Sequence, residues 1–289
     1  VITTFRGRGD EIKVYPLCFR EFMTAFDGTK ERGLDEYLIY GGMPQTLEYT
    51  NATKKTEYLK AMFTNTYIRD IKERYNIRND ELMDNLLDVI SSSIGSLTNP
   101  TKLANTLQSV RHENVGNKIV STYLEYICDS FLAERVSRYD VKGKSYFDTP
   151  YKYYFVDMGL RNARLNFRQS EPTHMMENII YNELRVRGYN VDVGIVPVVV
   201  RDASGKQVRS QLEIDFVCNF GSKKYYIQSA YRMPDEEKIR QEEASLRKVD
   251  DSFKKIVIIG EDIVVRHNEA GITTLGIYDF LLNPNSLEF

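Results

Sequence analysis

The spacing of apolar residues indicates helices in the first half of the chain. Leu82, Leu86 and Ile90, for example, recur one helical turn apart and share one face. Asn99-Pro100-Thr101 marks a helix start, because Asn caps a first turn and Pro fits its geometry. Helices are therefore expected over residues 19–26, 33–40, 53–75, 80–94, 101–109 and 116–132.

Two strand-like runs follow these helices, Ala133–Tyr139 and Tyr151–Val156, with a polar turn at Lys142-Gly143-Lys144 between them. Two strands joined by a polar turn predict a hairpin. Three helices followed by a hairpin is the plan of a winged helix, so residues 76–160 are assigned to one. Residues 1–75, which open with the strand-like Glu11–Tyr15, are assigned to a helical linker.

The last part of the chain contains both the apolar spacing of helices and the apolar spacing of strands. A helix over 173–187 ends at Gly188, a residue that commonly stops a helix. Strands are expected over 191–200, 212–220, 225–230 and 256–259, with a charged helix over 235–248 before the last of them. Strands and helices in this order predict a three-layer α/β domain over residues 161–289. The fold class expected for the chain is thus a multi-domain α+β or α/β protein.

Composition narrows the class of protein only a little. Lys and Arg number 39 against 41 Asp and Glu, so the chain as a whole is not a polycation, although a local basic patch can still bind nucleic acid. The three cysteines lie far apart, and no apolar run approaches the length of a membrane helix. A cytoplasmic location without membrane contact is expected. The start at Val1, without Met, suggests a piece of a longer protein.

Four residues form a candidate acidic site. Glu213 and Asp215 stand two apart on a predicted strand and so project from one face. Gln228 on the next strand offers a carbonyl oxygen, and Glu177 lies on the inward stripe of the preceding helix. Because a hard cation such as Mg²⁺ needs several oxygens, Glu213 and Asp215 are the candidate metal ligands.

The order of these residues resembles the PD-(D/E)xK restriction-endonuclease-like fold. That fold has an acid on a helix, an Asp on a strand and, on the next strand, an acid or amide two residues before a lysine. In this chain Ala230 stands where that lysine is expected. Lys224 is too distant along its strand, which leaves Lys238 on the following helix as a relocated lysine. The resemblance implies a degenerate site at Glu177, Asp215 and Gln228 that no longer cuts. The alternative is an active metal-dependent nuclease.

The predicted hairpin is locally basic. It contains five cations and only two acids, Asp140 and Asp148, which gives a local charge of +3. Aromatic residues lie among the cations, and basic and aromatic side chains together suit contact with phosphate and sugar. The helix over 116–132, by contrast, carries one lysine against two acids. DNA binding and contact with a protein partner therefore both stay open. The candidate nucleic-acid-binding residues are Arg135, Arg138, Lys142, Lys144 and Lys152.

Motifs along nearly the whole chain resemble the C-terminal part of a family of prokaryotic AAA-type ATPases, in which a P-loop domain precedes a domain of unknown function. The motifs are Phe5-Arg6-Gly7-Arg8, Tyr15-Pro16-Leu17, Phe19-Arg20-Glu21-Phe22, Tyr40-Gly41-Gly42-Met43-Pro44, Thr66-Tyr67-Ile68-Arg69-Asp70-Ile71, the run 152–162, the run 177–184, Glu213-Ile214-Asp215-Phe216 and Ile227-Gln228.

The family resemblance implies that an ATPase domain precedes Val1 in the parent chain and that residues 1–75 include the end of its core. ATP and Mg²⁺ are expected there, while this chain lacks a P-loop and needs no cofactor of its own. Arg6 or Arg8 would sense the nucleotide. The expected role is DNA binding or regulation within an AAA-type ATPase. The alternative is a protein-interaction or oligomerisation module of that ATPase, and whether this chain is itself an enzyme stays open.

Overall fold

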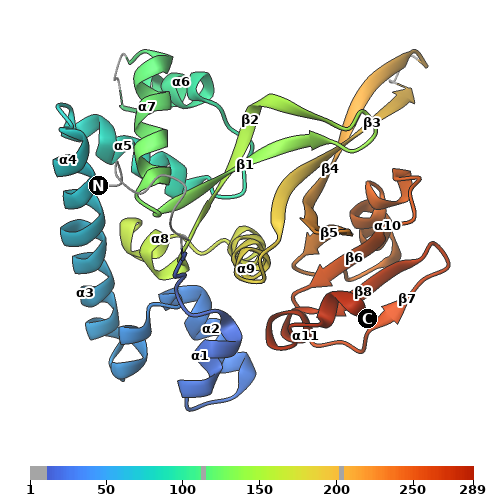
Figure 1. Cartoon of the computed structure of the whole chain (residues 1–289), viewed down its shortest axis with the longest axis horizontal. Helices are drawn as coiled ribbons and strands as arrows, with labels where there is room; N and C mark the ends of the chain where they lie inside the picture. Colours follow the sequence, from blue (N-terminus) through green and yellow to red (C-terminus); the bar gives the residue numbers. More distant parts are fainter. Residues whose placement is uncertain (1–11, 112–114, 202–204) are drawn as a thin grey trace.

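The computed structural model of the chain describes residues 12–111, 115–201 and 205–289 (Figure 1). Helices make up the first part of the chain, and one large sheet with flanking helices makes up the rest. The expectation of a mixed α/β protein is confirmed, with a fold compatible with the α+β class. Within the described ranges, every helix is too short or too polar to cross a lipid bilayer.

The helical part follows the apolar periodicity closely, and side chains cap several of its helices. Thr29 accepts a hydrogen bond from the Arg32 amide at the start of α2, and Asn79 accepts one from the Leu82 amide at the start of α5. A π-helical turn, Phe63–Ile68, joins two of the helices into one rod. The helices are α1 (Phe19–Ala25), α2 (Lys30–Tyr40), α3 (Ala52–Met62), α4 (Arg69–Tyr75), α5 (Asp80–Ser92), α6 (Pro100–Arg111) and α7 (Asn117–Asp129). Residues 12–15, expected as a strand, have no regular structure.

In the described part of the chain, eight strands form one mixed sheet in the order β2-β1-β3-β4-β5-β6-β8-β7. The central pairs β3–β4 and β4–β5 are antiparallel, whereas β5–β6 and β6–β8 are parallel. The strands are β1 (Ala133–Asp140), β2 (Ser145–Phe155), β3 (Asn190–Arg201), β4 (Gln207–Phe220), β5 (Lys223–Ala230), β6 (Lys254–Ile259), β7 (Arg266–His267) and β8 (Ile272–Gly276).

The hairpin β1–β2 belongs to this same sheet. Strand β1 pairs in parallel with β3, from Arg138 opposite Val193 to Asp140 opposite Ile195. Hydrogen bonds therefore continue from the hairpin, assigned above to a winged helix, into the strands assigned to the last domain. The expected boundary at residue 160 runs through a single sheet, and the hairpin is not a free wing beside α7 (Figure 1).

Helices cover both faces of the sheet. On one face lie α9 (Pro172–Val186) and α11 (Ile277–Leu282), whose apolar residues share a core with Tyr225 and Ile227 of β5. On the other face, a smaller core joins Tyr226 and Ala230 of β5 to the segment after α10 (Glu236–Glu243). The last elements, β7, β8 and α11, were not expected from the sequence, and neither was α8 (Met158–Arg164).

Two of the family-like motifs interlock through their backbones. Asp157, the N-cap of α8, accepts hydrogen bonds from the amides of Gly42 and Leu160. A Cβ on Gly159 would stand 2.1 Å from the carbonyl oxygen of Tyr40. Asn162 then donates to the carbonyls of Leu38 and Ile39 at the end of α2. The glycines of these motifs are thus required by close backbone packing.

Replacing Gly159 with Ala is expected to destabilise the fold strongly, because the new Cβ would overlap a backbone oxygen that cannot rotate away. The expected loss in the free energy of unfolding is about 3 kcal/mol, the upper part of the usual range for over-packing. The control is Gly116→Ala at the start of α7, where nothing lies within 4 Å of an added Cβ, and its cost should stay below about 1 kcal/mol. Chemical denaturation measures both, and equal midpoints would contradict the interlock.

Candidate functional site

A buried lysine and three carboxyl groups meet between β2, α9 and β4. The Nζ atom of Lys152 donates to Glu177 Oε1 at 2.7 Å. It also lies 2.8 Å from Glu213 Oε1 and 3.8 Å from Asp215 Oδ1. The acids come from α9 and β4, as the sequence predicts, and the cation comes from the hairpin strand β2. We call these four residues the lysine–carboxylate cluster.

The cluster is closed on most sides. The Lys152 side chain is 3% exposed, while that of Glu213 is 33% exposed and forms the open side. Tyr154 donates its hydroxyl to Glu177 Oε1 at 2.5 Å, and the Ser229 amide donates to Asp215 Oδ2 at 2.8 Å. A carboxylate and an ammonium can be buried together in this way because each satisfies the other's charge and hydrogen-bonding groups.

Local structure explains why these residues converge. The hairpin register places Lys152 opposite Val136, so that β2 carries the lysine toward α9. In β4 the ladder with β3 shifts between Asp192 and Gly194, as a β-bulge does. The bulge lets Asp215 and Phe216 lie on the α9 side, while Ile214 packs in the opposite core. Strict alternation, which the sequence pattern assumes, would have put Phe216 and Ile214 together.

Burial and the excess of carboxyl groups over cations shift the pKa values of Asp215 and Lys152 in the cluster. Burial, and then the neighbouring Glu177 carboxylate, raise the pKa of Asp215 to about 8. Burial opposes the charge on Lys152, but the surrounding carboxylates outweigh it and raise the pKa of that ammonium above its ordinary value. One ammonium cannot neutralise three carboxylates, and this shortage of positive charge raises the pKa of Asp215 in the same direction as burial does.

The prediction that Gln228 joins Asp215 is wrong. Gln228 lies between Tyr226 and Ala230, which face the smaller core, and its Oε1 accepts from Ser245 at 3.5 Å on that side. A lysine in place of Ala230 would be buried in this apolar core, so the position is not vacant for a catalytic lysine. Lys238 also fails as a relocated lysine, because it is part-exposed on α10 and pairs with Glu242.

A divalent metal does not fit the native cluster. The Lys152 ammonium already lies among the three carboxyl groups, and Gln228 is turned away from them. In the described ranges, His, Cys, Asp and Glu form no group of three or more that could hold a metal ion. The predicted ligands Glu213 and Asp215 are thus brought together, but around a lysine.

The basic hairpin divides into buried and exposed residues. Arg138 and Lys152 are buried, the first donating to Gln211 Oε1 at 2.8 Å and the second held in the cluster, so neither is available to a nucleic acid. Their assignment as nucleic-acid-binding residues is wrong, because on a sheet that continues into β3 alternate hairpin residues face the core. Lys142 and Lys144 are exposed in the turn, and Arg135 is exposed with its guanidinium over the Tyr151 ring.

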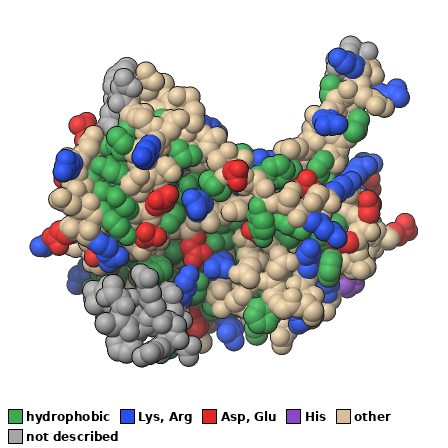
Figure 2. All heavy atoms as spheres, turned by 45° about the horizontal axis from the view of Figure 1, so that its top comes forward, with side chains coloured by type: hydrophobic (Ala, Val, Ile, Leu, Met, Phe, Trp, Pro, Cys, Tyr) green, Lys and Arg blue, Asp and Glu red, His purple; other side chains and the backbone are tan. Residues whose placement is uncertain are grey.

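Further basic residues lie where the sequence analysis did not place a site. Beyond Ile195, β3 loses its partner β1, and β4 gains its partner β5 only at Phe216. The two strands therefore project as a two-stranded arm, defined here as residues 196–201 and 205–212 (Figure 1). Arg201, Lys206 and Arg209 are exposed on it. Figure 2 shows Lys and Arg side chains gathered at the end of this arm, above a hollowed surface.

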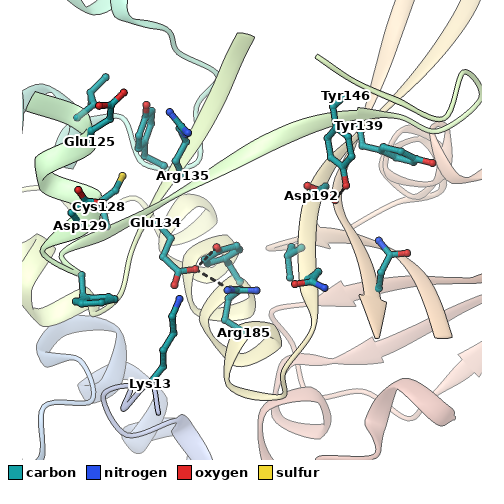
Figure 3. Close-up of a pocket in the computed structure, with 18 of the residues that line it drawn as sticks. Lys13, Glu125, Cys128, Asp129, Glu134, Arg135, Tyr139, Tyr146, Arg185 and Asp192 are labelled. Atoms are coloured by element: carbon teal, nitrogen blue, oxygen red, sulfur yellow. Dashed lines mark hydrogen bonds and ion pairs between the residues drawn. The ribbon is translucent and has the colours of Figure 1, made fainter. Parts of the chain in front are cut away.

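A large cavity of about 1020 Å³ lies between α7, β1 and β3 (Figure 3). Inside it, Glu134 accepts from the Tyr181 hydroxyl at 2.6 Å and from Arg185 Nε at 2.9 Å, and Lys13 points toward the same carboxylate. The lining balances its charges, which favours neither an anionic nor a cationic ligand. The charged lining residues are Lys13, Arg135, Arg185, Lys224, Glu125, Asp129, Glu134 and Asp192. The candidate nucleotide sensors Arg6 and Arg8 lie outside the described residues.

Comparison with known proteins finds relatives along the whole chain. A family described as "Domain of unknown function (DUF8612)" matches residues 31–171. An "Uncharacterized protein" of Haemophilus influenzae is 31% identical over 97% of this chain and 66% of its own length. The "Uncharacterized protein MJ1544" of Methanocaldococcus jannaschii is 26% identical over 96% of this chain and 62% of its own. The chain thus spans less than two thirds of these relatives.

Among solved structures, protein VC1899 from Vibrio cholerae aligns with 83% of this chain and 58% of its own. Its sequence identity is 13% and its TM-score is 0.30.

The protonation of Asp215 predicts a pH dependence of stability. A carboxyl whose pKa is raised to about 8 binds its proton more tightly in the fold than in the unfolded chain. Its contribution to the free energy of unfolding is therefore full below about pH 4 and is lost as the pH rises through about 8, with a slope of up to about 1.4 kcal/mol per pH unit. Asp215→Asn should flatten this slope.

Urea denaturation between about pH 6 and 9 measures the effect, because ordinary carboxyl groups no longer titrate in that range. The control is Asp148→Asn, which removes an exposed carboxylate of β2 and should keep the native slope. Identical slopes in the native chain and in Asp215→Asn would contradict a protonated Asp215.

Proposed function

We propose that this chain is the DNA-binding C-terminal region of an AAA-type ATPase and that its nuclease-like part binds duplex DNA without cutting it. The order α9-β3-β4-β5-α10-β6, with α9 and α10 on opposite faces, supports a PD-(D/E)xK-like scaffold. The helical acid Glu177 and the strand acid Asp215 lie in the places that this scaffold implies. On this proposal, the scaffold is retained and the chemistry is lost.

The loss of cutting rests on the lysine–carboxylate cluster. Metal-dependent phosphodiester cleavage needs carboxylate oxygens that are free to bind a cation. Here Lys152 engages Glu177 and Glu213, and the next strand presents Ser229 to the cluster in place of an acid. The position of Lys152 is the observation that separates a binding role from a nuclease role.

Binding is carried by the exposed face of the arm, the single observation on which the proposed function depends most. Cross-strand pairs place Val199 beside Arg209 and Arg201 beside Gln207 on one face, and every one of these side chains is exposed. On the opposite face, the paired Val198 and Ser210 are half-buried. Residues 196–212 hold three cations against Asp202 as the one acid. The arm is therefore a cationic two-stranded ribbon.

A two-stranded ribbon is one of the shapes that the DNA major groove admits. Arginine and lysine on its exposed face reach phosphate oxygens, which supply most of the affinity for a duplex. The hairpin turn with Lys142 and Lys144 neighbours the base of the arm, because Val141 donates its amide to the Ile195 carbonyl there. The turn and the arm together would line one side of the hollow seen in Figure 2.

Attachment to an ATPase rests on the family-like motifs and on length. The relatives extend beyond this chain by about a third of their length, which leaves room for another domain. ATP and Mg²⁺ would belong to that domain. The hydrogen bond from the Gly42 amide to Asp157 holds the first helices of the chain against the start of α8.

A second candidate is a protein-docking role for the same arm. Val199 and Val200 are 65% and 43% exposed, and the outer edges of the arm have no strand partner in the described structure. An unpaired edge with exposed valines suits addition of a strand from a partner protein. The two roles differ in their response to salt.

Arg201→Glu with Arg209→Glu is expected to abolish most binding of a labelled duplex in fluorescence anisotropy. Removing two phosphate contacts should lower the slope of log affinity against log salt by about 1.8, in addition to the repulsion of the new acids. The matched control is Arg32→Glu with Lys54→Glu, which makes the same change of charge on exposed residues of α2 and α3.

Equal loss of affinity in both double variants would show attraction by net charge alone and would contradict the arm as the binding surface. Absence of salt-sensitive binding by the native chain would remove the DNA proposal and favour the docking role.

A further inference from the structure

We infer that Lys152 is an internal cation that closes a divalent-metal site, so that a neutral side chain at this position opens the cluster to Mg²⁺ or Mn²⁺. The inference concerns the cluster alone and does not depend on DNA binding by the arm. It names the single residue that separates the native chain from a metal-binding one.

The position of the ammonium group is the first support. Lys152 Nζ lies 2.7 Å from Glu177, 2.8 Å from Glu213 and 3.8 Å from Asp215. A positive charge is thus already bound at the point where three carboxyl groups from two chain segments, α9 and β4, converge. Removing it would leave three carboxyl groups in a mostly buried space without a counter-ion.

The remaining groups suit a hard cation. Mg²⁺ and Mn²⁺ take carboxylate, hydroxyl and carbonyl oxygens and keep waters in the remaining positions. Ser229 is 8% exposed and lies on the β5 face that Asp215 contacts, and its Oγ has no hydrogen-bond partner among the residues that the structure describes. This buried oxygen adds a ligand beside the acids. The exposed side of Glu213 gives a path from solvent.

The native chain resists such a cation because the lysine cannot leave easily. Lys152 is tethered to β2, which is hydrogen-bonded to β1, and its side chain is only 3% exposed. Moving it out would break its hydrogen bond and ion pairs and leave the charge buried without partners. A covalently attached cation is effectively present at a fixed high concentration, so a dissolved cation must compete with it.

Lys152→Met tests the inference, because Met keeps the length of the side chain and removes its charge. Calorimetric titration with Mn²⁺ should find one site in Lys152→Met, at least tenfold tighter than any binding by the native chain. Lys152→Met combined with Asp215→Asn should lose that site. The matched control is Lys224→Met, which removes a half-buried lysine of β5 that lies away from the cluster and should create no site.

Lys152→Met is expected to be less stable without metal, since it leaves the carboxyl groups uncompensated. Circular dichroism with and without Mn²⁺ therefore accompanies the titration, and a variant that folds only with Mn²⁺ supports the inference equally. A variant that is folded but does not bind Mn²⁺, or unfolded and not rescued by it, overturns the inference. Equal Mn²⁺ binding by the native chain also overturns it and would favour a metal-dependent nuclease.

Discussion

The neutralisation of buried carboxylates by Lys152 ties the hairpin β1–β2 to α9 and β4. Glu177 and Asp215 belong to α9 and β4, whereas Lys152 belongs to the hairpin that follows the helices. A buried charge without a partner is costly, so the lysine and the acids each require the other in place. The pairing of β1 with β3 brings the lysine of the hairpin to the acids. The same pairing makes the hairpin part of the sheet instead of a separate wing.

The near balance of charge over the whole chain conceals two separate distributions. Inside, an excess of carboxyl groups surrounds one lysine, and burial together with this excess raises the pKa of Asp215. Outside, the cations of the arm stand on a projecting ribbon with few acids nearby. On the proposed function, binding and loss of cutting thus have different physical origins in one sheet. On that proposal the arm would supply the attraction to phosphate, while Lys152 would block the cation that cleavage needs.

The elements that sequence reasoning predicts well are those whose pattern is local. Helix α5 and strand β5 follow apolar periodicity, and the acids Glu177 and Asp215 meet as expected. The errors come from long-range pairing. Gln228 faces away because strand alternation puts Ser229 toward the acids, and Lys152 is buried because β1 pairs with a strand far along the chain. The sequence does not predict the cationic arm, because the arm begins where β3 and β4 lose their neighbouring strands β1 and β5. Those strand pairings cannot be read from amino-acid composition.

A crystal structure of the native chain soaked with Mn²⁺ tests the central claim most directly, because the anomalous signal of manganese locates the metal without reference to any activity. The account predicts no manganese peak among Glu177, Glu213 and Asp215, and it predicts the Lys152 ammonium between the first two, as found here. A manganese ion coordinated by these carboxylates, with Lys152 displaced, would contradict the account.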